Sequence, residues 1–168
     1  MSPDLRIRPA TTADIEGIIA VHRAAAAKPD GLARRPDEIT RDYVEHAVAG
    51  PGAVSFVALG SDGDIWGEIH GRRESVALFS HVLASLTVAV HPDRQGLGIG
   101  SRLFETLSAH ARAMQPPILR IELAAGAGNP GAVRLYERLG FQHEGRQIGR
   151  GRYPDGRLED DILMGMLL

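Results

Sequence analysis

A glycine-dense turn joins an apolar strand to an amphipathic helix, and it constrains the fold more than any other feature of the chain. The strand-like run ends at Val90, and the turn Gln95-Gly-Leu-Gly-Ile-Gly100 leads into a helical pattern. Glycines at alternate positions let the backbone turn without Cβ obstruction, so several N–H groups can converge on an anion at the positive end of the helix dipole. The turn therefore predicts a strand–turn–helix unit that binds a phosphate group.

Two common phosphate-binding loops do not match this turn. A Walker loop carries Lys-Ser/Thr after its last glycine, but here Ser101-Arg102 follows Gly100 and the single lysine is Lys28. A dinucleotide loop has the spacing G-x-G-x-x-G and an acidic residue about 20 residues later. The spacing here is G-x-G-x-G, and no acidic residue ends the next predicted strand where a ribose would lie. On the glycines alone, a tight turn that binds nothing stays an alternative.

A second motif, Asn129-Pro-Gly-Ala-Val-Arg-Leu-Tyr-Glu-Arg-Leu-Gly-Phe141, follows about thirty residues after the turn. It predicts a short helix with its own start and stop signals. Asn129 suits the N-cap, Pro130 suits the first helical position, and Gly140 suits the left-handed residue after the last turn. Leu135 and Leu139 share one face of this helix.

Together the two motifs resemble the GNAT superfamily of N-acetyltransferases. The turn matches the family's loop for the pyrophosphate of coenzyme A, and the asparagine followed seven residues later by tyrosine matches its pantetheine-side helix. The resemblance covers about residues 81 to 166. Ser80-His-Val82, Ile121-Glu-Leu123 and the turn Asp155-Gly156 resemble the branch that acetylates amino acids and small amines, including the phosphinothricin type. The chain departs from that branch at Arg157-Leu-Glu159, where an aromatic residue is usual, which leaves the acceptor open.

The rest of the pattern predicts elements in the order β-α-α-β-β-β-α-β-α-β-β. The predicted strands are Leu5–Pro9, Val54–Leu59, Ile65–Arg72, His81–Val90, Ile118–Leu123, Gln142–Arg152 and Arg157–Leu167. The predicted helices are Thr12–Ala27, Asp37–Ala49, a helix through Leu103, Leu107 and Met114, and the helix that Asn129 caps. The resemblance implies an α/β (α+β) GNAT fold: a mixed, mostly antiparallel twisted sheet of about seven strands, helices on both faces, and a splay between strands four and five.

Composition excludes several other classes of protein. A chain of 168 residues, 43% of them hydrophobic, can bury one core, so we expect a single domain over residues 1–168. The net charge of −2 gives no global attraction to nucleic acid or to an anionic membrane. The absence of cysteine excludes disulfides and thiolate metal sites. Without a long apolar run or a charged-then-apolar leader, a cytoplasmic protein is the expectation.

The resemblance implies that acetyl-CoA is the co-substrate. Backbone groups at the end of the fourth predicted strand take the pantetheine arm and face the thioester oxygen, and the glycine turn holds the pyrophosphate. The implied cofactor-binding residues are Val88, Ala89, Val90, Gln95, Gly96, Leu97, Gly98, Ile99, Gly100, Ser101, Asn129 and Tyr136.

The resemblance also implies two catalytic residues. Tyr136 matches the tyrosine that gives a proton to the leaving sulfur, and Glu122 matches a glutamate near the acceptor amine and is the candidate base. Glu122 alternates with apolar neighbours and so faces away from them. His70, which shares a strand face with Glu68, is an alternative base, as are His81 and a chain of waters. No histidine pair has metal-ligand spacing, so no metal is expected.

The predicted function is transfer of an acetyl group from acetyl-CoA to a primary amine of a small molecule or amino acid, by direct attack in a ternary complex. Acetylation of a protein or peptide amine and non-catalytic binding of acyl-CoA are the alternatives. The first two helices, their loop and the last hairpin are expected to form the acceptor pocket, with Arg34, Arg35 and Arg152 as candidates for a carboxylate. The apolar end Ile162–Leu168 suits either a homodimer contact or an internal strand.

Overall fold

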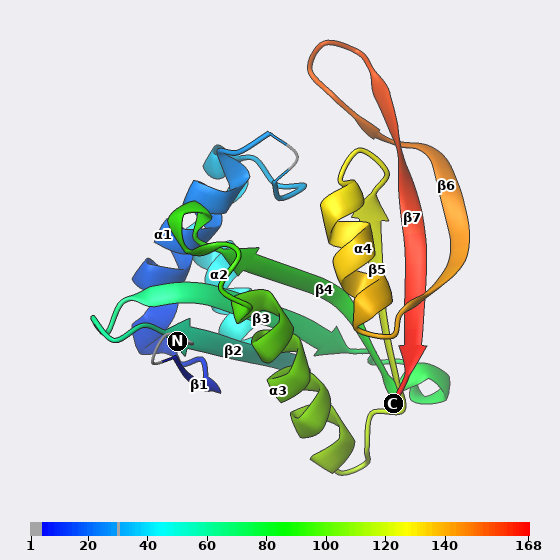
Figure 1. Ribbon diagram of the computed structural model, residues 1–168. Coiled ribbons are helices and arrows are strands. Elements are labelled where there is room, and N and C mark those ends of the chain that lie inside the picture. The colour runs from blue at the N-terminus through cyan, green and yellow to red at the C-terminus, as the bar shows by residue number, and fades with distance from the viewer. Residues whose placement is uncertain (1–4, 30) are drawn as a thin grey trace.

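The computed structural model describes residues 5–29 and 31–168 and shows one sheet of seven strands (Figure 1). The strand order is β1-β2-β3-β4-β5-β7-β6; β4 and β5 are parallel, and the other neighbours are antiparallel. The strands are β1 Arg6–Pro9, β2 Ala53–Leu59, β3 Ile65–Arg73, β4 Val82–Val90, β5 Arg120–Gly126, β6 Gln142–Arg152 and β7 Leu158–Leu167. The helices are α1 Ile15–Ala26, α2 Arg41–Ala49, α3 Ile99–Ala113 and α4 Pro130–Arg138, with 3-10 turns at Thr12–Asp14, Pro36–Glu38, Ala77–Phe79 and Pro92–Arg94. The predicted fold is confirmed.

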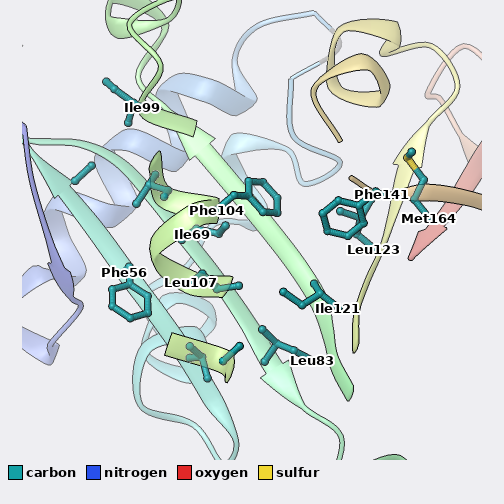
Figure 2. Packing of buried hydrophobic residues seen from close by; sticks show 14 of the residues in the cluster. Phe56, Ile69, Leu83, Ile99, Phe104, Leu107, Ile121, Leu123, Phe141 and Met164 are labelled. Atoms are coloured by element: carbon teal, nitrogen blue, oxygen red, sulfur yellow. The ribbon is translucent and has the colours of Figure 1, made fainter. Parts of the chain in front are cut away.

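The helices cover the two faces of the sheet in pairs. Helices α1 and α2 pack on one face, and α3 and α4 lie on the other (Figure 1). The larger core lies under α3 and α4, where Phe104 of α3 contacts Phe141 with ring centroids 5.9 Å apart (Figure 2). This core takes residues from both halves of the sheet, including Leu83 of β4 and Met164 of β7. Side-chain packing therefore joins the half of the sheet that ends at β4 to the half that begins at β5.

Three predicted elements differ from the structure by more than one residue at an end. The strand expected at Ile118–Leu123 begins at Arg120 and continues to Gly126, because its alanines pair with β7 and this tertiary pairing outweighs their weak strand propensity. The first helix begins with a 3-10 turn and becomes α-helical only at Ile15. The second is interrupted, since Thr40 caps a separate helix by accepting a hydrogen bond from Tyr43 N.

Strands β4 and β5 meet at one end and diverge toward the other (Figure 1). Within the described residues, the two strands pair only at Val82 with Arg120 and at Leu83 with Ile121. A β-bulge lies just beyond this pairing, where Ser85 has φ 55° and the register with β3 shifts. Bulges bend a strand and increase its twist. The predicted splay is therefore present, and the bulge lies where β4 leaves its neighbour.

A partly buried ion pair fixes the start of α1. Arg8 donates two hydrogen bonds of 2.7 Å to Asp14, whose side chain is 8% exposed, and this pairing outweighs burial and lowers the pKa of Asp14 to about 2. A carboxyl group with a lowered pKa stabilises the fold above its unfolded pKa near 4 and loses that contribution as the pH falls toward 2.

Asp14→Asn is expected to lower the free energy of unfolding by about 2 kcal/mol at neutral pH, because the ion pair that lowers the pKa of Asp14 to about 2 is lost. Denaturant titrations at several pH values measure it. The difference from the wild type is expected to shrink between about pH 4 and pH 2. Asp37→Asn, at an exposed carboxylate, is the matched control. A difference that stays constant with pH would contradict the ion-pair explanation.

Candidate active site

The open edge of β4 carries backbone groups that no strand of the described chain pairs. His91 N donates to Trp66 O at 2.8 Å, which sets the alternation of hydrogen bonds between β4 and β3. In an antiparallel ladder, alternate residues direct their N–H groups to opposite sides. Ala89 therefore faces β3, whereas Val88 and Val90 direct their N–H groups toward the side that β5 has left. An extended amide can add to such an edge as an extra strand.

The glycine turn lies at the end of this edge and opens onto solvent. Gly96 and Gly98 have φ values of 78° and 74°, in the left-handed region where other residues are strained, and a Cβ at either position would meet no atom within 4 Å. Gly98 is the N-cap of α3, so the first N–H groups of the helix are presented here. Ile99 anchors the turn because its side chain is buried in the core, whereas Leu97 is 43% exposed.

Gly100 shows that the two sequence motifs meet in space. A Cβ built there would lie 3.8 Å from Leu135 Cδ2 of α4 and 4.0 Å from Val90 Cγ2 of β4. These are ordinary van der Waals distances, so the fold itself does not require glycine at this position. The predicted N-cap is also present, because the Asn129 side chain accepts a hydrogen bond of 3.1 Å from Ala132 N. The left-handed Gly140 that ends α4 is confirmed by its φ of 100°.

Tyr136 lies on α4 with its ring held by two phenylalanines. Its ring centroid is 5.6 Å from that of Phe104 and 5.8 Å from that of Phe141. Burial raises the pKa of Tyr136 to about 12, so the hydroxyl keeps its proton through the neutral range. In residues 5–29 and 31–168, no hydrogen-bond partner of this hydroxyl is found, which leaves it available to a ligand.

A cavity of about 1110 Å³ occupies the α1 and α2 side of the sheet, on the opposite face from α3 and α4. Its walls come from the loop before α2, from α2 itself, and from strands β3 to β7. Of the residues expected there, Glu122, His70 and Arg34 line it, whereas His81, Arg35 and Arg152 do not. The side chains that line it include Arg34, Glu38, Tyr43, His46, His70, Thr87, Arg120, Glu122, Glu144 and Arg150.

Glu122 faces this cavity at the centre of β5. Arg120 Nε donates to Glu122 Oε2 at 3.0 Å, and the same guanidinium forms two hydrogen bonds with Glu144, one of them 2.8 Å long. The Glu122 side chain is 42% exposed. The network holds the Glu122 carboxylate through Oε2, and the residue lines the cavity. Sequence reasoning did not identify Arg120, because its partner Glu144 is on a strand 24 residues away.

A second polar cluster lies behind the cavity wall. Glu68 of β3 is fully buried and accepts hydrogen bonds from His22 Nε2 at 2.7 Å, from Ser55 Oγ at 2.7 Å and from His70 Nδ1 at 3.0 Å. Burial alone would raise the pKa of Glu68, but attraction to His70 and hydrogen bonds from both imidazoles hold it at about 2. The two histidines and Glu68 also form a set that a metal ion can use. The short donor–acceptor distances are those of hydrogen bonds. Among the described residues, His22 Nδ1 is buried and has no hydrogen-bond partner.

Known proteins share this architecture and parts of this sequence. The model of the acetyltransferase (GNAT) family matches residues 20–141. The chain is 32% identical to the L-methionine sulfoximine/L-methionine sulfone acetyltransferase of Pseudomonas aeruginosa over 89% of each protein. It is 36% identical to the ribosomal protein bS18-alanine N-acetyltransferase of Escherichia coli over 58% of this chain and 66% of that protein.

Among solved structures, a phosphinothricin acetyltransferase of Sinorhizobium meliloti in complex with AcCoA superposes with a TM-score of 0.85, at 20% identity, over 100% of this chain and 89% of that one. This likeness supports the fold. The family match and the relatives' names confirm the predicted superfamily, its amino-acid branch and the enzymatic activity. The chain belongs to the GNAT family of acetyl-CoA-dependent N-acetyltransferases.

Proposed function

We propose that this enzyme acetylates the primary amine of a small, amino-acid-like molecule, with donor and acceptor meeting at the open edge of β4. The observation that carries the proposal is the cavity of about 1110 Å³ that reaches β4 from the side opposite the glycine turn. A cavity of this size suits a small molecule. The acceptor amine can therefore approach the thioester from one face while the coenzyme lies on the other.

The donor is proposed to lie along β4 and across the glycine turn. The N–H groups of Val88 and Val90 pair with the pantetheine arm, and Val88 N–H faces the thioester oxygen. Backbone groups from Gln95 to Ser101, including Gly96, Leu97, Gly98, Ile99 and Gly100, hold the pyrophosphate. Ala89 supports this edge through its pairing with Glu68, and Asn129 holds the start of α4 beside the pantetheine arm.

The proposed chemistry uses Tyr136 and Glu122. The amine nitrogen attacks the thioester carbon, the new C–N bond forms, and the C–S bond breaks with its electron pair going to sulfur. Tyr136 gives its proton to the sulfur. Glu122 takes the proton that the nitrogen loses as the amide forms, and that proton returns through water to the Tyr136 oxygen.

The acceptor class is inferred from the relatives and from the cavity wall. The relative from Pseudomonas aeruginosa is named for L-methionine sulfoximine and L-methionine sulfone, both of them amino acids. Arg34 stands at the cavity with its guanidinium carbon 4.0 Å from the centre of the Tyr43 ring. This cation-π contact holds the guanidinium where it can meet the carboxylate of an amino acid. A peptide amine is the second candidate, because the shorter match is named for an alanine of a ribosomal protein.

A panel of acceptors tests this function. Release of coenzyme A thiol from acetyl-CoA is followed with L-methionine sulfoximine, L-methionine sulfone, phosphinothricin, the amide of each, and a peptide with N-terminal alanine. We expect the free amino acids to react fastest and the amides to lose most of that rate, because Arg34 has no carboxylate to bind. A preference for the peptide would assign the enzyme to protein acetylation. Tight binding of acetyl-CoA without thiol release for any amine would contradict the enzymatic proposal.

The domain extent, the absence of a metal, the localisation and the oligomeric state of the enzyme are also proposals. We propose that one domain spans residues 1–168, that no metal takes part, and that the enzyme works in the cytoplasm as a homodimer. To test whether a metal takes part, the acceptor panel is run with and without a chelator, and equal rates are expected.

No helix in the described part of the chain has the length and apolar character of a membrane span.

A further inference from the structure

A histidine and a tyrosine face each other on the wall of the acceptor cavity, in front of the buried Glu68 cluster. The distance from His70 Nε2 to the Tyr43 hydroxyl oxygen is 3.3 Å, and both side chains line the cavity. His70 pairs across the ladder with Thr87, the residue that precedes Val88 on β4. The pair therefore stands beside the strand where the thioester is proposed to lie.

The hydrogen bonds behind His70 fix where its proton lies. Glu68 is ionised and accepts only, so the Nδ1 atom of His70, 3.0 Å away, must carry the hydrogen. With Nδ1 as the only protonated nitrogen, the ring has its lone pair on Nε2, 3.3 Å from the Tyr43 hydroxyl oxygen. Burial raises the pKa of Tyr43, so this hydroxyl is protonated and donates to Nε2. Its oxygen keeps lone pairs for a donor in the cavity.

A buried carboxylate and two aromatic side chains surround the ring of His70. Glu68 of the same strand supplies a buried negative charge, which a protonated imidazole would neutralise as an ion pair. Two further groups face the ring: His22 of α1, stacked with centroids 5.8 Å apart, and Tyr43 of α2, over whose ring Arg34 lies. Glu122 lines the same cavity from β5. A proton transferred to Nε2 would therefore have a fixed carboxylate as its counter-charge, 3.0 Å from the other ring nitrogen.

We propose that His70, acting through the Tyr43 hydroxyl, accepts the proton that converts the acceptor ammonium into the attacking amine. The inference rests on the proposed function and names a further catalytic pair for it. The ammonium N–H gives its proton to the Tyr43 oxygen while the Tyr43 proton moves to His70 Nε2. The nitrogen lone pair so freed then forms the C–N bond.

The proton count of the whole reaction balances with this step. An ammonium and a thioester yield an amide, a thiol and one free proton. The proton on His70 is the one released to solvent through the cavity, while Glu122 and Tyr136 handle the second proton as described above. Glu68 is a positioning residue, since it fixes the tautomer of His70, and His22 in turn holds the Glu68 carboxylate.

His70→Asn tests the proposal, because the asparagine amide can still donate to Glu68 but cannot accept a proton. With an amine that the wild type acetylates, kcat/KM for the amine is expected to fall about 10²-fold or more at neutral pH. The loss is expected to shrink as the pH rises toward the pKa of the free amine, because solution then supplies neutral amine. Affinity for acetyl-CoA is expected to stay unchanged. His143→Asn, at an exposed histidine paired with Glu137, is the matched control.

Three other results would contradict proton transfer to His70. A rate equal to the wild type at every pH would show that His70 takes no proton, while leaving the acetyltransferase itself intact. A folded variant that binds acetyl-CoA and is inactive even at high pH would assign His70 a binding role. If His70→Asn does not fold, Tyr43→Phe interrupts the same path, and an unchanged pH profile there would contradict the relay. Failure of the wild type to acetylate any amine would count against the proposed function instead.

Discussion

Tyr136→Phe is expected to lower kcat by about 10²-fold to 10³-fold, because the sulfur would leave as a thiolate without a proton donor. The pKa of about 12 means that Tyr136 is protonated at every pH where the enzyme is normally assayed. No alkaline loss of rate is therefore expected from this group below about pH 11. The measurement is the rate of thiol release at saturating acetyl-CoA and acceptor over a range of pH.

The packing around Tyr136 makes it possible to distinguish a loss of proton donation in Tyr136→Phe from a loss of structure. The ring of Tyr136 packs against Phe104 and Phe141, and phenylalanine preserves that packing. The thermal midpoint and the affinity for acetyl-CoA are expected to stay close to those of the wild type. A more acidic thiol leaves more easily as an unprotonated thiolate. With an acetyl thioester of such a thiol, the ratio of wild-type kcat to Tyr136→Phe kcat is therefore expected to be smaller. An unchanged kcat with acetyl-CoA would remove Tyr136 from the chemistry.

Gly100→Asp is expected to weaken binding of acetyl-CoA at least about tenfold, since charges about 4 Å apart repel by about 1 kcal/mol even in water and by more in a protein site. Binding is measured by calorimetry with acetyl-CoA or coenzyme A. Gly100→Asn has nearly the same size without the charge, and it is the matched control. The difference between the two variants is expected to decrease with added salt.

Gly100 is a better test position than Gly98 because of its backbone. Gly98 has φ 74°, so a side chain there would strain the turn whether or not it binds phosphate. Gly100 lies in the first turn of α3, where a carboxylate is favourable to the helix by about 0.3 to 1 kcal/mol. We therefore expect Gly100→Asp to bind the coenzyme poorly without losing stability. Equal affinity for both variants and the wild type would place the pyrophosphate elsewhere.

Local signals in the sequence predicted the backbone around the proposed donor site well. Asn129, Pro130 and Gly140 each act on the backbone within a few residues, so their positions around α4 follow from the sequence alone. The glycine turn is similar, because a positive φ at Gly96 and at Gly98 is a local requirement. The strand edge before it was also expected, and the structure adds that Val88 and Val90 carry its outward N–H groups.

The acceptor half could not be predicted in this way because its contacts join distant segments. Alternation placed Glu68 and His70 on one strand face, but nothing in the sequence connects Glu68 with His22, 46 residues away. No residue type marks the bulge at Ser85, whose left-handed backbone occurs at a serine instead of a glycine. The end of β5 at Gly126 likewise depends on pairing with β7. Tertiary structure decides each of these features.

The separation of β4 from β5 has a consequence for how enzymes with this fold change their acceptor during evolution. Main-chain N–H groups make most of the proposed donor site, whereas side chains from α2 and five strands line the proposed acceptor cavity. A point mutation replaces a side chain and leaves the peptide groups where they are. Single substitutions are therefore free to change which amine is acetylated, while the use of acetyl-CoA is inherited until a turn glycine is lost.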